Sequence, residues 1–319
     1  MSFNDGANLD TSQVGSGGGG GGRGGGGRMI PGGVGVGGIG GVILLVLYLF
    51  FGDALSGGGG GQPGGQPDPQ GMNVQSVDAA GTGSDQVSQQ INQCQTGADA
   101  NKDDTCRVIG TVNSVQDFWS KHLPEHGKDY TPAKTILYQG QTQTQCGTGS
   151  SQMGPFYCPL DQQVYIDVSF FNDLSTNYGA DGGTLAQMYV VAHEYGHHIQ
   201  QLTGSLGRAQ QDPQGPQSGA VRTELQADCY AGLWVRHAET TKDANGTTLL
   251  KPVTQKDINS ALSAASAVGD DRIQEKAQGR VTPESWTHGS SAQRQKWFMV
   301  GYNGGDMNDC DTFNTTDLG

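Results

Sequence analysis

The glycine-rich stretches near the amino terminus limit where this chain of 319 residues can form a folded core. Residues 14–28, VGSGGGGGGRGGGGR, contain no apolar face to bury, and residues 56–71, SGGGGGQPGGQPDPQG, have the composition of a flexible linker. We therefore expect residues 1–33 to be a disordered glycine-rich segment and residues 53–84 to be a linker rich in Gly, Pro and Gln. A folded domain is expected over residues 85–319, which is enough chain for one sizeable core.

An uncharged apolar run, VGVGGIGGVILLVLYLFFG, covers residues 34–52 and is long enough to cross a bilayer core of ~30 Å as a helix. Arg23 and Arg28 precede it, so the positive-inside rule predicts a cytoplasmic amino terminus, one transmembrane helix and a large domain outside the cell membrane. A cleaved signal peptide is the alternative, because residues 42–51 have the length of its apolar region. We favour the anchor, since no clean Ala-x-Ala cleavage site follows the run.

The charge of the chain argues against nucleic acid as a partner. The formal net charge is −13 at pH 7, whereas phosphate binding needs clustered Lys and Arg residues. The glycine runs also lack the preceding strand and the Gly-Lys-Ser/Thr ending of a phosphate-binding loop. We therefore interpret these glycines as linker.

All the cysteines follow the apolar run, at positions 94, 106, 146, 158, 229 and 310. An even number of cysteines in an oxidising compartment predicts disulfide bonds. The sequence alone does not choose among the pairings, but short separations favour Cys94 with Cys106 and Cys146 with Cys158, which leaves Cys229 with Cys310. A zinc ribbon is not indicated, because no Cys-x-x-Cys pair exists.

The folded region has the sequence pattern of an α+β domain with a small sheet. Residues 164–171, VYIDVSFF, alternate and are rich in β-branched and aromatic residues, which is typical of a strand. A helix should follow, with Thr184 as its N-cap and Gly204 as its stop signal. Further helices are expected over residues 220–239, 257–274 and 290–302.

The helix after Thr184 contains the sequence AHEYGHHIQQ, in which His-Glu-x-x-His places His193 and His197 four residues apart, with Glu194 after the first. On an α-helix this spacing brings both imidazoles to one face, so both can reach a single ion. The five-residue motif also occurs by chance, and a buried amphipathic helix with polar histidines is the alternative. His198 lies ~100° further around the helix, so we expect it to contact a polar group instead.

A catalytic zinc ion usually takes three protein ligands and keeps one position for water. The metzincin pattern would need Gly and His where this chain has Gln200 and Thr203, so that pattern is excluded. The helix expected over residues 220–239 has Glu224 and Asp228 on one face. These carboxylates could also form a solvated face or pair with Arg222. We predict a site for Zn²⁺ in which Asp228 accepts a hydrogen bond from a ligating histidine and the ligands are His193, His197 and Glu224.

Four longer blocks of sequence surround these residues. They are GPFYCPLDQQVYIDVSFFNDL (154–174), YVVAHEYGHHIQ (189–200), RTELQADCYAGLW (222–234) and HGSSAQRQKWFMVGYNGGDMNDCDTF (288–313). Together they resemble the predicted bacterial neutral zinc metallopeptidases, a membrane-anchored group of the zincin, or thermolysin-like, superfamily. The resemblance implies an α+β zincin fold that hydrolyses peptide bonds with zinc, preceded by a glycine-rich amino terminus and one membrane span.

The motif also assigns catalytic roles. Glu194 is expected to be the general base that takes the proton of a zinc-activated water and passes it to the leaving amine. His288, in the fourth block, is the candidate donor to the oxyanion, with a loop or capping role as the alternative. Residues 164–171, if they border the cleft, could bind an extended peptide or protein substrate as an added strand.

Two other functions are compatible with the same residues. One is a catalytically silent, membrane-anchored extracytoplasmic scaffold or binding protein that keeps a zincin fold. Glu194 favours the enzyme, because a binding protein needs metal ligands and has no use for a base. The other is hydrolysis of a non-protein amide such as a cell-wall peptide.

Overall fold

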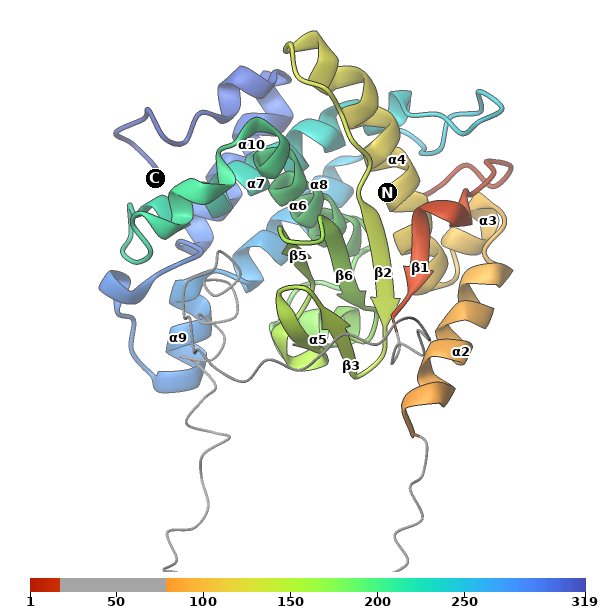
Figure 1. Ribbon diagram of the computed structural model, residues 1–319. Coiled ribbons are helices and arrows are strands. Elements are labelled where there is room, and N and C mark those ends of the chain that lie inside the picture. The colour runs from red at the N-terminus through yellow and green to blue at the C-terminus, as the bar shows by residue number, and fades with distance from the viewer. Residues whose placement is uncertain (18–78) are drawn as a thin grey trace, which may run out of the picture.

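The computed structural model describes residues 1–17 and 79–319, in which helices and strands form a mixed fold (Figure 1). The helices are α2 (Ala79–Gln93), α3 (Gly97–Ala100), α4 (Asp104–Glu125), α5 (Phe170–Thr176), α6 (Thr184–Thr203), α7 (Gly219–His237), α8 (Gln255–Ala267), α9 (Asp270–Gln278) and α10 (Ser291–Gly304). The strands are β1 (Val14–Ser16), β2 (Lys134–Tyr138), β3 (Gln141–Thr144), β4 (Gly147–Ser150), β5 (Phe156–Cys158) and β6 (Gln163–Asp167). In Figure 1 the sheet lies near the centre, with α2 beside β1 and α9 on the opposite side.

The main sheet has the strand order β1-β2-β6-β5. β1, β2 and β6 run parallel, and β5 pairs antiparallel with β6 at one edge. β3 and β4 form a separate hairpin. The predicted strand over residues 164–171 is shorter than expected, because the Asp167 side chain accepts hydrogen bonds from the backbone amides of Ser169 (3.0 Å) and Gly140 (2.9 Å) and so stabilises a turn.

Helix α6 lies at the centre of the fold, where α4, α7, α8 and the sheet pack around it. Thr184 is its first residue and Gly183 its N-cap, so the predicted capping role of Thr184 is wrong by one position. Gly204 ends the helix in the left-handed conformation with φ 82°, as predicted. Helices α6 and α7 approach closely at Gly196, where an added Cβ would lie 2.9 Å from the Ala227 Cα.

The amino-terminal residues 1–17 belong to the folded domain, so the prediction of a disordered segment over residues 1–33 is wrong for this part. Phe3 is fully buried and β1 pairs with β2 from Val14 to Ser16. Few apolar residues precede the glycine runs, but they pack into the core of the domain. Phe3, for example, packs against Gly110. Residues 18–33 lie outside the described residues.

The predicted single-pass membrane topology is also corrected. Among residues 1–17 and 79–319, no helix is both long and apolar enough to span a bilayer. The candidate span, residues 34–52, lies outside the described residues. Strand β1 precedes that span and β2 follows it, yet the two strands pair in one sheet. A single crossing would place the two strands on opposite sides of a membrane. The predicted topology, with a cytoplasmic amino terminus and an outer catalytic domain, is therefore wrong. The predicted fold class is wrong in including this transmembrane helix.

Other boundaries differ from the sequence patterns. The helix expected over residues 257–274 is divided into α8 and α9, because Gly269 acts as the N-cap of a new helix. The linker expected up to residue 84 ends earlier, since α2 begins at Ala79. The long helix α4 had no counterpart among the predicted elements.

The predicted disulfide pairs are all present: Cys94–Cys106, Cys146–Cys158 and Cys229–Cys310. The first joins the end of α2 to α4, and the second joins the β3–β4 hairpin to the edge strand β5. The third joins α7 to the segment that follows α10 across a sequence separation of 81 residues. This last bond fixes the carboxyl-terminal segment against a helix that also contributes to the candidate site.

Candidate metal centre

Two neighbouring helices bring three candidate metal ligands together. His193 and His197 come from α6 and Glu224 comes from α7, and one donor atom from each lies within 4.8 Å of the others. The Nε2 atoms of the two histidines are 3.1 Å and 3.5 Å from the carboxylate oxygens of Glu224. Both imidazoles are buried, and the Glu224 side chain is 14% exposed. The three groups therefore converge at one point on the wall of a cavity.

The second nitrogen of His193 is held by a buried carboxylate. Its Nδ1 lies 2.9 Å from Oδ1 of Asp228, one turn beyond Glu224 on α7. An ionised carboxylate only accepts hydrogen bonds, so His193 must donate through Nδ1 and present Nε2 to the Glu224 side. Burial opposes the charged form of Asp228, but the charges and hydrogen bonds of Arg294 and His193 together outweigh burial and lower the pKa of this carboxyl.

The second nitrogen of His197 is held by neutral amides instead. Its Nδ1 lies 2.9 Å from Oε1 of Gln200, one turn further along α6. The Gln200 amide nitrogen donates to the Thr223 carbonyl (2.6 Å) and to Oε1 of Gln226 (3.1 Å), which fixes the orientation of the amide group. Gln226 in turn donates to the Cys310 carbonyl at 3.0 Å. His197 therefore also donates through Nδ1 and keeps Nε2 for a ligand.

Glu194 differs from the other carboxylates of the site. It is 7% exposed and lines the same cavity, of about 150 Å³, as His193, His197, Glu224 and His288. Within the described parts of the chain, its carboxylate accepts no hydrogen bond from a protein group. Burial raises the pKa of Glu194, and the two nearby imidazoles offset part of that rise. This carboxylate is therefore free to act on a small molecule in the cavity.

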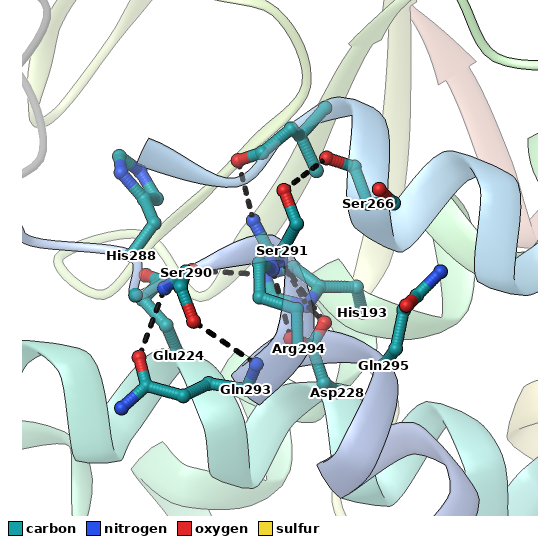
Figure 2. A network of polar contacts seen from close by, with 12 residues as sticks. His193, Glu224, Asp228, Ser266, His288, Ser290, Ser291, Gln293, Arg294 and Gln295 are labelled. Carbon is teal, nitrogen blue, oxygen red and sulfur yellow. Dashed lines mark hydrogen bonds and ion pairs between the residues drawn. The ribbon is translucent and has the colours of Figure 1, made fainter. Parts of the chain in front are cut away.

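His288 lies at the mouth of this cavity, in the loop that precedes α10. Its Nδ1 is 3.2 Å from Oδ1 of Asp270, the first residue of α9, and its side chain is 30% exposed. The other oxygen of Asp270 accepts the backbone amides of Thr287, His288 and Gly289 at 2.7 to 3.0 Å. Burial opposes the imidazolium, but the charge and hydrogen bond of Asp270, together with the charge of Glu224, outweigh burial and raise the pKa of His288. Figure 2 shows His288 close to the Glu224 side of the site.

The donor set fits zinc. Two imidazole nitrogens and one carboxylate, each available on the side that faces a common point, are ligands that Zn²⁺ takes in catalytic sites. Burial opposes a charged imidazole, yet Asp228 and Glu224 together raise the pKa of His193 to about 10. A proton on Nε2 and a zinc ion would therefore compete for the same lone pair, as is usual for histidine ligands.

The family described as "Putative neutral zinc metallopeptidase" matches residues 3–313, which is nearly the whole chain. The chain belongs to this family. The matched range begins ahead of β1 and ends beyond α10, so family membership covers the amino-terminal segment together with the helices of the site.

Two similar proteins carry names that state no activity. Uncharacterized protein Rv2575 of Mycobacterium tuberculosis (strain ATCC 25618 / H37Rv) is 56% identical over 230 residues, which cover 72% of this chain and 77% of the relative. Uncharacterized protein YpfJ of Escherichia coli (strain K12) is 39% identical over 285 residues, which cover 86% and 87% of the two chains. No solved structure matches the chain.

The structure of this zinc-peptidase family member places the predicted site residues around one cavity, with Asp228 directly behind them. His198 stays outside the metal group, as expected: it bonds to the Thr131 carbonyl (2.6 Å) and to the Tyr157 hydroxyl (3.1 Å). These two contacts fasten the motif helix α6 to the edge strand β5 and to the segment before β2.

Sequence patterns missed three residues around the site. Gln200 lies three residues beyond His197, and this helical spacing could have identified it. Arg294 and Asp270 carry no comparable signal, because their partners are distant in sequence: Arg294 contacts Asp228 across 66 residues. The contribution of these residues follows only from the packing of α7, α9 and α10.

The cleft is bordered by β5 and not by the strand that was expected there. β6 is paired on both sides, with β2 and with β5, so it has no free edge for an added strand. β5 lies at one edge of the sheet, and its residues Phe156 and Tyr157 line the cavity at the motif. A larger cavity of about 550 Å³ shares Phe170, Tyr178 and Ile273 with this one. The site therefore opens onto an extended and largely apolar surface.

Proposed function

We propose that this family member is a zinc metalloendopeptidase of the zincin type, which hydrolyses peptide bonds in peptide or protein substrates. His193, His197 and Glu224 hold the ion, and Asp228 supports the first of them. The observation that carries the proposal is the difference among the carboxylates around the cavity. Glu224 faces two imidazole nitrogens and Asp228 is engaged by His193 and Arg294, whereas Glu194 has no protein hydrogen-bond donor in the described residues.

This arrangement supplies the groups that peptide hydrolysis needs. Bound zinc supplies Lewis-acid chemistry, because it lowers the pKa of a water toward neutrality and polarises the scissile carbonyl. Glu194 accepts the proton of the attacking water and delivers it to the leaving amine. His288 donates a hydrogen bond to the carbonyl oxygen as negative charge develops, and Asp270 favours the charged imidazole by raising the pKa of His288.

The edge strand supports an extended substrate. Unpaired backbone groups of β5 can bind a peptide as an additional strand, which presents successive bonds to the site without a deep specificity pocket. The apolar side chains along the cavity, including Phe170, Tyr178 and Ile273, favour substrates with large apolar residues near the cleaved bond.

The test is the substitution Glu194→Gln in the full chain. We expect peptide hydrolysis to fall ~10²- to 10⁴-fold, because the variant lacks the base, while it keeps one zinc equivalent and the wild-type unfolding midpoint. The exposed Glu239 provides a matched control, and Glu239→Gln should retain wild-type activity. Cleavage of an unbiased peptide library and elemental analysis are the measurements.

Two outcomes would contradict the proposal. Wild-type protein that binds less than about a tenth of a zinc equivalent after loading would remove the metal site. Wild-type protein that binds zinc fully, yet cleaves nothing in the library, would favour a binding protein with this fold over an enzyme.

A further inference from the structure

A buried arginine lies directly behind the candidate metal centre, on a helix that contributes no metal ligand. The side chain of Arg294 on α10 is 4% exposed, and that of its partner Asp228 on α7 is fully buried. The guanidinium donates to both carboxylate oxygens, from Nε to Oδ2 at 2.8 Å and from Nη2 to Oδ1 at 3.0 Å (Figure 2). Arginine forms this two-pronged contact with a fixed orientation that a lysine cannot reproduce.

The same guanidinium is held on its other sides. Nη2 donates to the hydroxyl of Tyr189 (3.2 Å), which itself donates to Asp228 Oδ1, and Nη1 donates to the Val268 carbonyl at 3.2 Å. Nη2 also lies 3.4 Å from His193 Nδ1, so the partners of the guanidinium come from α6, from α7 and from the end of α8. Tyr189 lies one turn before His193 on α6, so Arg294 contacts the ligand helix as well as the supporting carboxylate.

The start of α10, just before Arg294, is held by contacts of its own. Ser290 and Gln293 form a capping box, and the Ser291 hydroxyl donates to the Ser266 carbonyl at 2.9 Å. The Ser291 amide donates to the Asp271 side chain at 2.8 Å, so α10 is attached to the junction of α8 and α9. These contacts fix the start of α10, from which Arg294 extends, and Figure 2 shows Ser266, Ser290, Ser291 and Gln293 around Arg294.

We propose that Arg294 is a positioning residue for zinc, acting through Asp228 on the orientation of His193. The inference rests on the proposed function, because it assigns Arg294 to the same zinc site. Oδ1 of Asp228 is shared by His193, Tyr189 and Arg294, whereas Oδ2 has Arg294 as its partner in the described chain. Without Arg294 the carboxylate loses the contact that fixes its plane, and the imidazole of His193 loses a rigid acceptor.

A substitution at Arg294 can affect the site by two routes, through His193 or through His288, and the two routes can be separated. His288 lies in the loop immediately before α10, so a change at Arg294 could also displace His288. If the effect passes through His193, zinc affinity falls and added zinc restores activity. If it passes through His288, zinc affinity is unchanged and added zinc restores nothing.

The experiment measures zinc binding to the full chain by competition with a chelator. In Arg294→Met, which keeps the length of the side chain but removes the guanidinium, the zinc dissociation constant should rise ~10- to 100-fold. Arg294→Lys should lie between Arg294→Met and wild type, because it restores the charge without the two-pronged contact. Arg236→Met removes an exposed arginine from α7 and is the matched control, with wild-type affinity expected.

A spectroscopic measurement and a double-mutant cycle test the route. The visible absorption of the Co²⁺-substituted protein reports ligand geometry, and it should change in Arg294→Met but not in Arg236→Met. Arg294→Met should add little to the affinity loss of Asp228→Asn, since both act on one contact. The double variant leaves no unpaired buried charge, so together with Arg294→Lys it keeps the test available if Arg294→Met fails to fold.

The outcomes separate this inference from the proposed function. If wild-type protein binds zinc and Arg294→Met matches it in affinity and Co²⁺ spectrum, or if the two losses are simply additive, Arg294 has no positioning role. If wild-type protein binds no zinc, the proposed function fails and this inference fails with it.

Discussion

The two histidines of the site lie four residues apart on one helix, yet the protein supports them with different chemistry. Behind His193 is a buried ion pair, in which Asp228 is held by Arg294. Behind His197 is a chain of neutral amides, from Gln200 to Gln226 and on to the carbonyl of Cys310. The first support joins α6, α7 and α10, and the second joins α6 and α7 to the disulfide-bonded carboxyl-terminal segment.

This difference has energetic consequences. A carboxylate strengthens the basicity of the imidazole that it supports, whereas an amide oxygen mainly fixes its orientation. Breaking a buried ion pair leaves an uncompensated charge, while breaking an amide chain leaves unsatisfied neutral groups at lower cost. We therefore expect the two supports to differ in how strongly their loss affects zinc binding and folding.

The largest effect should follow the loss of the charged support. Asp228→Ala leaves Arg294 buried without its carboxylate, so the free energy of unfolding should fall by ~3–5 kcal/mol. Zinc affinity should fall ~10- to 100-fold as His193 loses its acceptor, and added metal should restore part of the activity. Urea unfolding and chelator competition measure the two quantities. A variant with wild-type zinc affinity would show that the charged support does not serve the metal.

The disulfide at the far end of the amide chain should have the next largest effect. Replacing Cys229 and Cys310 by serine should lower the free energy of unfolding by ~2–5 kcal/mol, because the bond closes a long loop. Since Gln226 donates to the Cys310 carbonyl, zinc affinity should also decrease. The matched control replaces Cys94 and Cys106, whose loop is shorter and remote from the site, and equal zinc affinity in the two double variants would contradict this link.

The neutral support should matter less than the charged one. Gln200→Met removes the acceptor of His197 and the donor to the Thr223 carbonyl, at a cost of ~1–3 kcal/mol in unfolding free energy. The zinc dissociation constant should change by less than in Asp228→Ala. Gln217→Met, at an exposed position, is the control. If Gln200→Met weakened zinc binding more than Asp228→Ala, the proposed ranking of the two supports would be reversed.

The smallest effect is expected at the pair outside both supports. Asp270 raises the pKa of His288 above its usual 6.5 against the effect of burial, so the pair stabilises the fold below that pH and loses this contribution as pH rises through the folded pKa. Asp270→Asn should therefore lower the unfolding free energy relative to wild type more at about pH 5.5, roughly one unit below the usual value, than at alkaline pH. The alkaline limb of the activity profile should move to lower pH, because His288 loses the carboxylate that raises its pKa. A stability difference independent of pH would mean that only the backbone contacts of Asp270 matter.

Local spacing explains why much of the site could be predicted. The helical period places His193 with His197, and Glu224 with Asp228, on common faces without any knowledge of packing. Short separations along the chain were sufficient to favour two disulfide bonds, and the third followed. The end of the helix at Gly204 depends on the backbone freedom of that glycine, so it could also be predicted from the sequence.

The structural features that local sequence patterns did not predict depend on contacts between residues far apart in the chain. The composition around residues 14–28 predicted disorder, but β1 gains its partners from β2, more than a hundred residues later, and that pairing also overturned the single-pass topology. The approach of α6 to α7 at Gly196 decides that Glu224 reaches the two histidines. Arg294 acquires its role only when α10 packs against α7. Sequence thus determined which side chains share a helix face, whereas the tertiary structure decided which faces meet, because buried contacts between distant segments leave no periodic signal along the chain.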